Sequence, residues 1–135
     1  MKRYLDRYRI CTACCLLLCV MQAAMFLWAS AAAARCITGR AGMFTAVLIA
    51  CAAVHAVMSV RSFGFLHVFF AAGGDLLSGD SFRVNHRIYL CEAVMPKFRR
   101  WCVIAFATGV LLVVAEFVCF AVAELSIHGL QHVSG

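Results

Sequence analysis

Residues 102–125 read CVIAFATGVLLVVAEFVCFAVAEL, and this stretch decides what kind of fold the chain adopts. A helix needs about 20 apolar residues to cross the ~30 Å hydrocarbon core of a bilayer, and the stretch meets that length. Its interior holds one carboxylate, Glu116. An ionised carboxylate at bilayer depth costs several kcal/mol unless it is paired, protonated or hydrated. Glu116 is therefore expected to have a partner or a task.

The composition extends the membrane prediction to the whole chain. Of the 135 residues, 65% are hydrophobic and 13% are charged, whereas soluble domains are about 25% charged. Further apolar runs cover residues 11–34 and residues 42–60, the latter with an extension to 73. We predict an all-α integral membrane fold that forms a single membrane domain over residues 1–135. It has three transmembrane helices and a polar loop at 74–100.

The second apolar run admits two registers because Arg61 interrupts it. In the first register, residues 42–60 span the membrane and Arg61 extends its charged end to the interface, with the Phe-rich extension near the headgroups. In the second, the span slides to about 50–73 and buries Arg61. The first register is favoured because it leaves no charge in lipid. Both are compatible with one long helix bent near Gly64.

The segment between the second and third runs has the pattern of an amphipathic helix. Asp80 or Ser81 is placed to cap this helix, and Pro96 is placed to end it. Apolar residues recur within it at i, i+4, i+7 and i+11, namely Val84, Ile88, Cys91 and Met95. We predict an interfacial helix that lies on the membrane surface or packs on a partner. A solvated helix that covers the inner ends of the spans fits the pattern equally well.

The basic residues flank the apolar runs and orient the chain. Ten Lys and Arg residues lie in the N-terminal segment, at position 61 and in the 73–100 loop, against only Arg35 and Arg40 on the opposite side. The positive-inside rule therefore places the N-terminus and the long loop on the matrix or cytosolic side. Lipid headgroups account for the net charge of +6, and no nucleic-acid binding is expected.

Depth along each helix, at about 1.5 Å per residue, suggests which groups Glu116 meets. Glu116 lies roughly 21 Å and Gln22 roughly 16 Å from the inner ends of their runs, so a hydrogen bond is within side-chain reach. In the favoured register His55 lies at only about 8 Å, too shallow to meet Glu116 easily. In the slid register Arg61 lies at roughly 18 Å, where a buried ion pair with Glu116 becomes attractive. These four residues are the candidate intramembrane contacts.

Glu116 has three candidate roles. It forms hydrogen bonds between helices of this chain or of a neighbouring subunit, it carries a proton or cation, or it contacts lipid, quinone or another cofactor. Haem ligation through His55 or His67 would need a second chain, because the two lie too far apart on one helix to bind the same iron. No cofactor and no metal site is predicted.

The nine cysteines do not suggest a secreted disulfide scaffold, because most of them lie in or beside the apolar runs. Cys11, Cys14 and Cys15 share one helical face with Cys19 at the start of the first run. Packing against a neighbouring helix is the default interpretation. Reversible acylation of juxtamembrane cysteines is the functional one.

The sequence contains no catalytic motif that would indicate an enzyme. It lacks the phosphate-binding loops GxxxxGK[ST] and GxGxxG, the zinc motif HExxH and the nucleophile motif GxSxG. We expect a non-catalytic structural or accessory subunit of a multi-subunit integral-membrane complex, with other membrane subunits as partners. A respiratory or ATP-synthase assembly of the mitochondrial inner membrane is the favoured setting, and the endoplasmic reticulum is the second. The alternatives are a proton or cation channel or transporter component that uses Glu116, and a haem- or quinone-binding membrane anchor.

Overall fold

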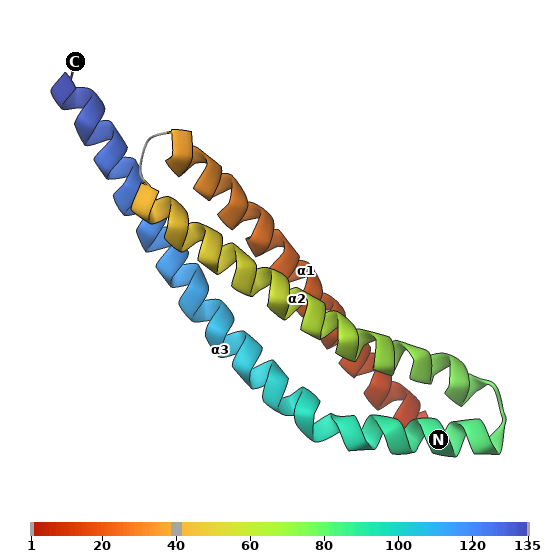
Figure 1. The fold of residues 1–135 in the computed structure, drawn as a ribbon. Helices are drawn as coiled ribbons and strands as arrows, with labels where there is room; N and C mark the ends of the chain where they lie inside the picture. The colour runs from red at the N-terminus through yellow and green to blue at the C-terminus, as the bar shows by residue number, and fades with distance from the viewer. Residues whose placement is uncertain (1, 39–41, 135) are drawn as a thin grey trace. The chain divides into compact units, whose positions relative to one another are not determined.

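The chain folds into three long helices. A computed structural model describes residues 2–38 and 42–134, with side chains described as far as Gly129. The helices are α1 (Lys2–Thr38), α2 (Gly42–Leu77) and α3 (Ser81–Ser134) (Figure 1). Each is long and apolar enough to cross a membrane. The prediction of an all-helical protein with three candidate membrane spans is confirmed.

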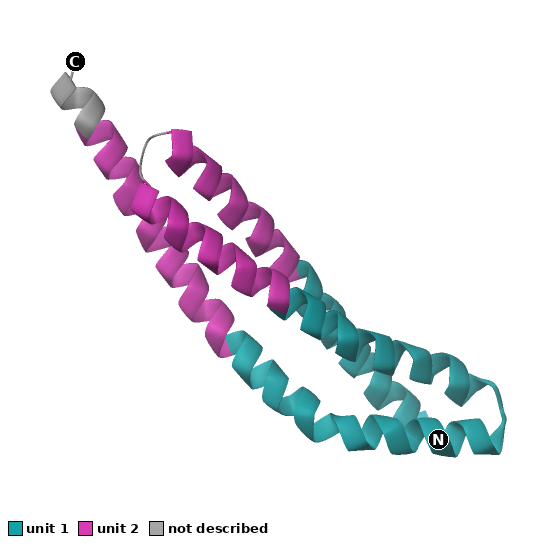
Figure 2. Cartoon of the chain, in the orientation of Figure 1, with its two compact units in different colours: residues 1–20, 58–106 teal, residues 21–57, 107–135 magenta. Residues whose placement is uncertain are grey.

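The helices contribute to two compact units (Figure 2). Unit 1 consists of residues 1–20 and 58–106, and unit 2 consists of residues 21–57 and 107–135. Unit 1 contains ten Lys and Arg residues against four Asp and Glu residues, whereas unit 2 contains two of each kind. The whole net charge of +6 therefore belongs to unit 1.

A tight turn joins α2 to α3 within unit 1. Gly79 has a φ of 77°, in the left-handed region that glycine enters without steric cost. Asp80 then caps α3, because its Oδ1 accepts a hydrogen bond from the Phe82 backbone N–H at 3.1 Å. The cap that the sequence predicts at Asp80 is confirmed.

No separate interfacial helix forms in the described residues, contrary to our expectation. Pro96 does not end a short helix but lies inside α3, which continues from Ser81 to Ser134. Proline lacks one backbone donor and usually kinks a helix, yet a long helix continues through it when neighbouring helices support the backbone. Figure 1 shows α3 bent in its turquoise section.

The apolar stripe at the start of α3 faces the core of unit 1. Val84, Cys91 and Met95 are buried there, and Ile88 packs against the same cluster. The cluster also contains Tyr8 of α1 and Phe69 of α2. The periodicity thus identifies a real packing face, but this chain's own helices cover it.

The second apolar run forms one continuous helix through Arg61 and Gly64. The Arg61 guanidinium lies over the Trp101 ring, 5.2 Å from its centroid. The same tryptophan donates a hydrogen bond from its Nε1 to the buried Ser62 Oγ at 2.9 Å. An exposed arginine beside an aromatic ring is typical of a helix segment at a membrane interface.

Small residues dominate the core of unit 2. Ala32, Ala33 and Cys36 of α1 pack there with Leu48 of α2 and Ala123 of α3. The Arg35 guanidinium forms a bidentate ion pair with the Glu124 carboxylate. Trp28 packs on Phe117 and Phe120, with ring centroids 4.7 and 5.7 Å apart. Because alanine and cysteine take little space, the three helix backbones approach closely in this unit.

Candidate functional site

One buried polar cluster in unit 2 joins all three helices. Gln22 of α1, His55 of α2 and Glu116 of α3 meet through their side chains. His55 Nδ1 lies 2.5 Å from Gln22 Oε1, and His55 Nε2 lies 2.6 Å from Glu116 Oε1. His55 and Glu116 are completely buried and Gln22 is 6% exposed. We call these three side chains the polar triad.

The hydrogen-bond partners of the polar triad limit which protonation forms it can take. The amide oxygen of Gln22 only accepts hydrogen bonds, so His55 Nδ1 carries a proton and donates it. A hydrogen bond between Nε2 and the Glu116 carboxyl then needs one more proton, held by either partner. The pair is a neutral histidine beside a carboxylic acid, or an imidazolium beside a carboxylate. Both forms have zero net charge, which suits a site at bilayer depth.

The expectation that His55 is too shallow to meet Glu116 is wrong. It counted only the rise of the backbone, whereas helical side chains lean toward the N-terminus of their own helix. Because α2 and α3 run in opposite directions (Figure 1), His55 and Glu116 lean toward each other. The depth of about 8 Å for His55 moreover takes residue 60 as the end of the span, whereas α2 continues to Leu77.

The expected contact of Gln22 with Glu116 is indirect. Gln22 reaches His55, and the imidazole ring bridges it to the carboxylate. Gly109 on α3 makes room for the amide, because a Cβ built on this glycine would lie 3.2 Å from Gln22 Nε2. Gly109 therefore serves a contact with a polar side chain.

One atom of the polar triad has no hydrogen-bond partner. Glu116 Oε2 is buried, and no group in the described part of the chain donates to it. A buried acceptor without a partner costs about 1–3 kcal/mol, less when the carboxyl is protonated. This oxygen is where a water molecule or a cation would find a vacant acceptor.

Arg61 does not belong to the polar triad. Its contact with Trp101 lies in unit 1, so the ion pair with Glu116 that the slid register suggested is not formed. Among the four candidate contacts, the structure brings Gln22, His55 and Glu116 together and places Arg61 elsewhere.

The three candidate acylation cysteines differ in exposure. Cys14 is exposed, whereas Cys11 and Cys15 are buried in the core of unit 1. Their spacing predicts a shared face, and that face is mainly a packing face. Only Cys14 presents its thiol to the surroundings of the helix.

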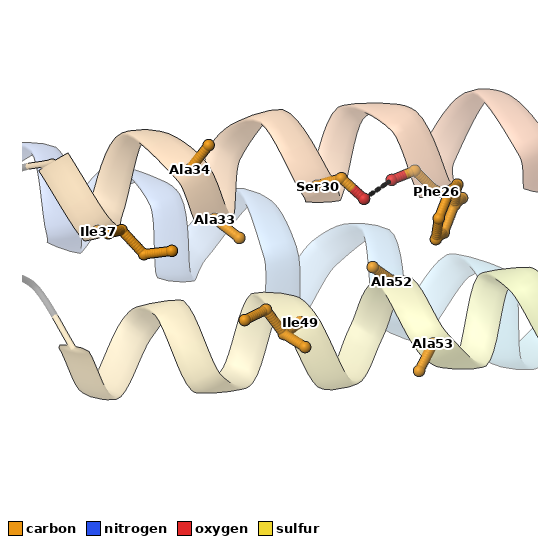
Figure 3. A pocket seen from close by; sticks show the side chains of 8 residues that line it. All are labelled: Phe26, Ser30, Ala33, Ala34, Ile37, Ile49, Ala52 and Ala53. Atoms are coloured by element: carbon orange, nitrogen blue, oxygen red, sulfur yellow. Dashed lines mark hydrogen bonds between the residues drawn. The ribbon is translucent and has the colours of Figure 1, made fainter.

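A shallow apolar groove of about 330 Å³ lies between α1 and α2 in unit 2 (Figure 3). Alanines from both helices line it, and Phe26, Ile37 and Ile49 lie along its edges. Ser30 also contributes, but its Oγ donates a hydrogen bond to the Phe26 carbonyl oxygen at 2.8 Å. The many alanines of these two helices predict close helix packing. They do not predict that a groove stays open between the helices.

Comparison of the chain with protein families, curated proteins and solved structures finds no match. The features that bear on function are the polar triad, the groove of unit 2 and the charge of unit 1.

Proposed function

We propose that this protein is a non-catalytic accessory subunit of a multi-subunit integral-membrane complex. The observation that carries the proposal is the alanine-lined groove between α1 and α2 in unit 2. In lipid, helices associate through close van der Waals packing, and small residues at the contact let the backbones approach. A groove with Ala34 and Ala53 exposed on its two walls offers such a contact to a helix of another chain.

The polar triad supports the structural part of this proposal. Each of its members comes from a different helix, so its two hydrogen bonds hold α1, α2 and α3 in one register. Polar groups that bond one another across membrane helices stabilise the bundle by about 1–2 kcal/mol each in model peptides. The triad would then keep unit 2 rigid enough to present the groove.

We place the complex in the mitochondrial inner membrane, with a respiratory or ATP-synthase assembly as the leading setting and the N-terminus on the matrix side. The charge of unit 1 supports this orientation, since basic segments are retained on the negative side of a membrane. The endoplasmic reticulum is the second setting.

Purification from native membranes in mild detergent, followed by mass spectrometry, tests the proposal. Ala34→Leu and Ala53→Leu add bulk at the two rims of the groove and should reduce recovery of specific membrane partners. Ala31→Leu is the matched control, because Ala31 is exposed on the same helix and does not line the groove. Partner recovery that all three variants leave unchanged, or a stable active monomer, would reject the proposal.

The polar triad favours a second candidate function, a proton or cation channel or transporter component. The His55–Glu116 pair shares one proton, and the vacant acceptor Glu116 Oε2 could receive a proton or coordinate a cation. Glu116→Gln should abolish proton or cation flux in reconstituted liposomes if this function holds. Unchanged flux would reject it.

A haem- or quinone-binding anchor is the least supported alternative. Both ring nitrogens of His55 are already engaged, by Gln22 and Glu116, so this residue has no lone pair left for iron. Exposed His67 would have to supply the ligand. The visible spectrum of the purified protein tests haem binding, because a Soret band would support it and the absence of that band would reject it.

A further inference from the structure

Unit 1 contains a second groove, of about 440 Å³, between the start of α1 and the end of α2. Tyr8 and Arg9 line it from α1, and Phe69, Phe70, Gly73 and Gly74 line it from α2. The groove lies where the apolar run of α1 begins and where that of α2 gives way to Asp75. In a membrane-spanning chain, such a boundary lies at the level of the lipid headgroups.

The floor of this groove is apolar, and its one polar group, the Tyr8 hydroxyl, already has a hydrogen-bond partner. Tyr8 and Phe69 are each 1% exposed, and their rings pack with centroids 6.0 Å apart. The Tyr8 hydroxyl donates to Glu92 Oε1 at 2.9 Å, so its polar end is directed away to a partner on α3. What remains for a ligand is the apolar surface above this floor, formed by Phe70, which is 72% exposed, and by Ala71, as a lipid chain prefers.

The glycines keep the groove open. A Cβ built on Gly73 or on Gly74 would meet no atom within 4 Å. Both residues lie inside α2 with ordinary helical geometry, where glycine is less favourable than alanine by about 1 kcal/mol. The absence of side chains at both positions therefore leaves free volume along the α2 wall.

Arg9 is the one charged residue on the groove, and it is not neutralised. Two arginines of unit 1 are neutralised by carboxylates, Arg7 by Glu92 at 3.0 Å and Arg87 by Asp75 at 2.7 Å. In the part of the chain that the structure describes, no carboxylate lies within ion-pair distance of Arg9. Its guanidinium is exposed and free to bind an anion.

We propose that this groove binds an anionic phospholipid, with the phosphate on Arg9 and an acyl chain along the apolar surface of Phe70 and Ala71. Arginine presents planar paired donors that match a phosphate group. Unit 1 has ten basic and four acidic residues, and this positive charge favours an anionic lipid over a zwitterionic one. The site is independent of the proposed partner contact, because it lies on different residues in the other unit.

Native mass spectrometry in mild detergent tests the site, with phosphatidylglycerol as the probe and phosphatidylcholine as the zwitterionic comparison. The wild-type chain should retain phosphatidylglycerol preferentially. Arg9→Gln should weaken that binding about fivefold, the equivalent of the ~1 kcal/mol that one basic residue contributes at a lipid surface. Gly74→Leu should weaken it as much or more by filling the groove, and Arg9→Lys should retain part of the affinity.

Two matched controls separate the site from general attraction. Arg3→Gln removes the same charge from the same helix but does not line the groove, and Gly64→Leu adds the same side chain at another open position of α2. Both should bind within about twofold of wild type, by the same free-energy scale.

Three outcomes would overturn the proposal. Equal losses of phosphatidylglycerol binding in Arg9→Gln and Arg3→Gln would show that the lipid is held by general electrostatic attraction and not by this site. Unchanged binding in Gly74→Leu, with Gly73→Leu as the second groove-filling variant, would show that the groove is not used. Displacement of the lipid by inorganic phosphate at equal concentration would indicate a simple anion site.

Discussion

Replacing His55 with leucine should destabilise unit 2 more than any other single change in the polar triad. Leucine has a similar volume, so the substitution removes the two hydrogen bonds without opening a large cavity. Gln22 Oε1 and Glu116 Oε1 would then be buried without a partner. Each orphaned buried group costs about 1–2 kcal/mol in a membrane helix bundle, which gives about 2–4 kcal/mol in total.

Substitutions of Glu116 should follow a definite order. Glu116→Gln should cost less than about 1 kcal/mol, because the new amide can donate to His55 Nε2. Glu116→Leu should cost about 1 kcal/mol, since it orphans Nε2 but also removes the unpaired Oε2. Adding Glu116→Leu to His55→Leu should restore about 1–2 kcal/mol, because the double variant leaves only Gln22 without its partner.

Unfolding in phospholipid–detergent bicelles measures these differences. Trp28 packs on Phe117 within unit 2 and reports its integrity by fluorescence. A Trp101→Phe background leaves Trp28 as the single tryptophan, because the chain has two. Every triad variant is compared within that background.

The sign of the double-variant effect is the decisive result. If His55→Leu/Glu116→Leu were less stable than His55→Leu alone, the two side chains would not be coupled as the geometry requires. A loss below about 0.5 kcal/mol for His55→Leu would also refute the reasoning, because it is too small for two orphaned buried groups.

Three further results are expected. Gly109→Ala should lower the free energy of unfolding by about 1 kcal/mol because its Cβ would crowd the Gln22 amide. Gly64→Ala, at an open position, should be neutral or stabilising by up to ~1 kcal/mol. The reverse order of stability in bicelle unfolding would contradict the packing. Trp101→Phe should cost about 1 kcal/mol through the lost hydrogen bond to Ser62, and Ser62→Ala made in that background should add little. Hydroxylamine-sensitive acylation, measured by peptide mass spectrometry, should occur at exposed Cys14 and not at its buried neighbours; modification only at the buried thiols would oppose this.

The architecture could be predicted from the sequence because it depends on local quantities. Apolar runs long enough to span a bilayer predict three helices, and the 3.6-residue period predicts the packing face that includes Val84 and Cys91. Pro96 misled the prediction because a local rule treats proline as a helix end. Continuation through it depends on neighbouring helices that the local sequence does not contain.

The polar triad could be predicted only in part. The cost of burying a carboxylate identifies Glu116 as a residue that needs a partner, and the sequence offers few polar groups to supply one. Choosing His55 required the direction in which helical side chains lean and the position at which α2 ends, Leu77. Residue counting along one helix gives neither. The role of Gly109 likewise depends on its contact with the Gln22 amide, which belongs to another helix.

The concentration of net charge in unit 1 has a consequence for biogenesis. Moving one elementary charge through a membrane potential changes its energy by about 2.3 kcal/mol per 100 mV, so the six net positive charges of this unit correspond to about 14 kcal/mol per 100 mV. In the energised membrane proposed above, the potential would hold these segments on the negative side during insertion. Dissipating the potential while the chain is being made should produce a fraction of molecules threaded in the opposite sense.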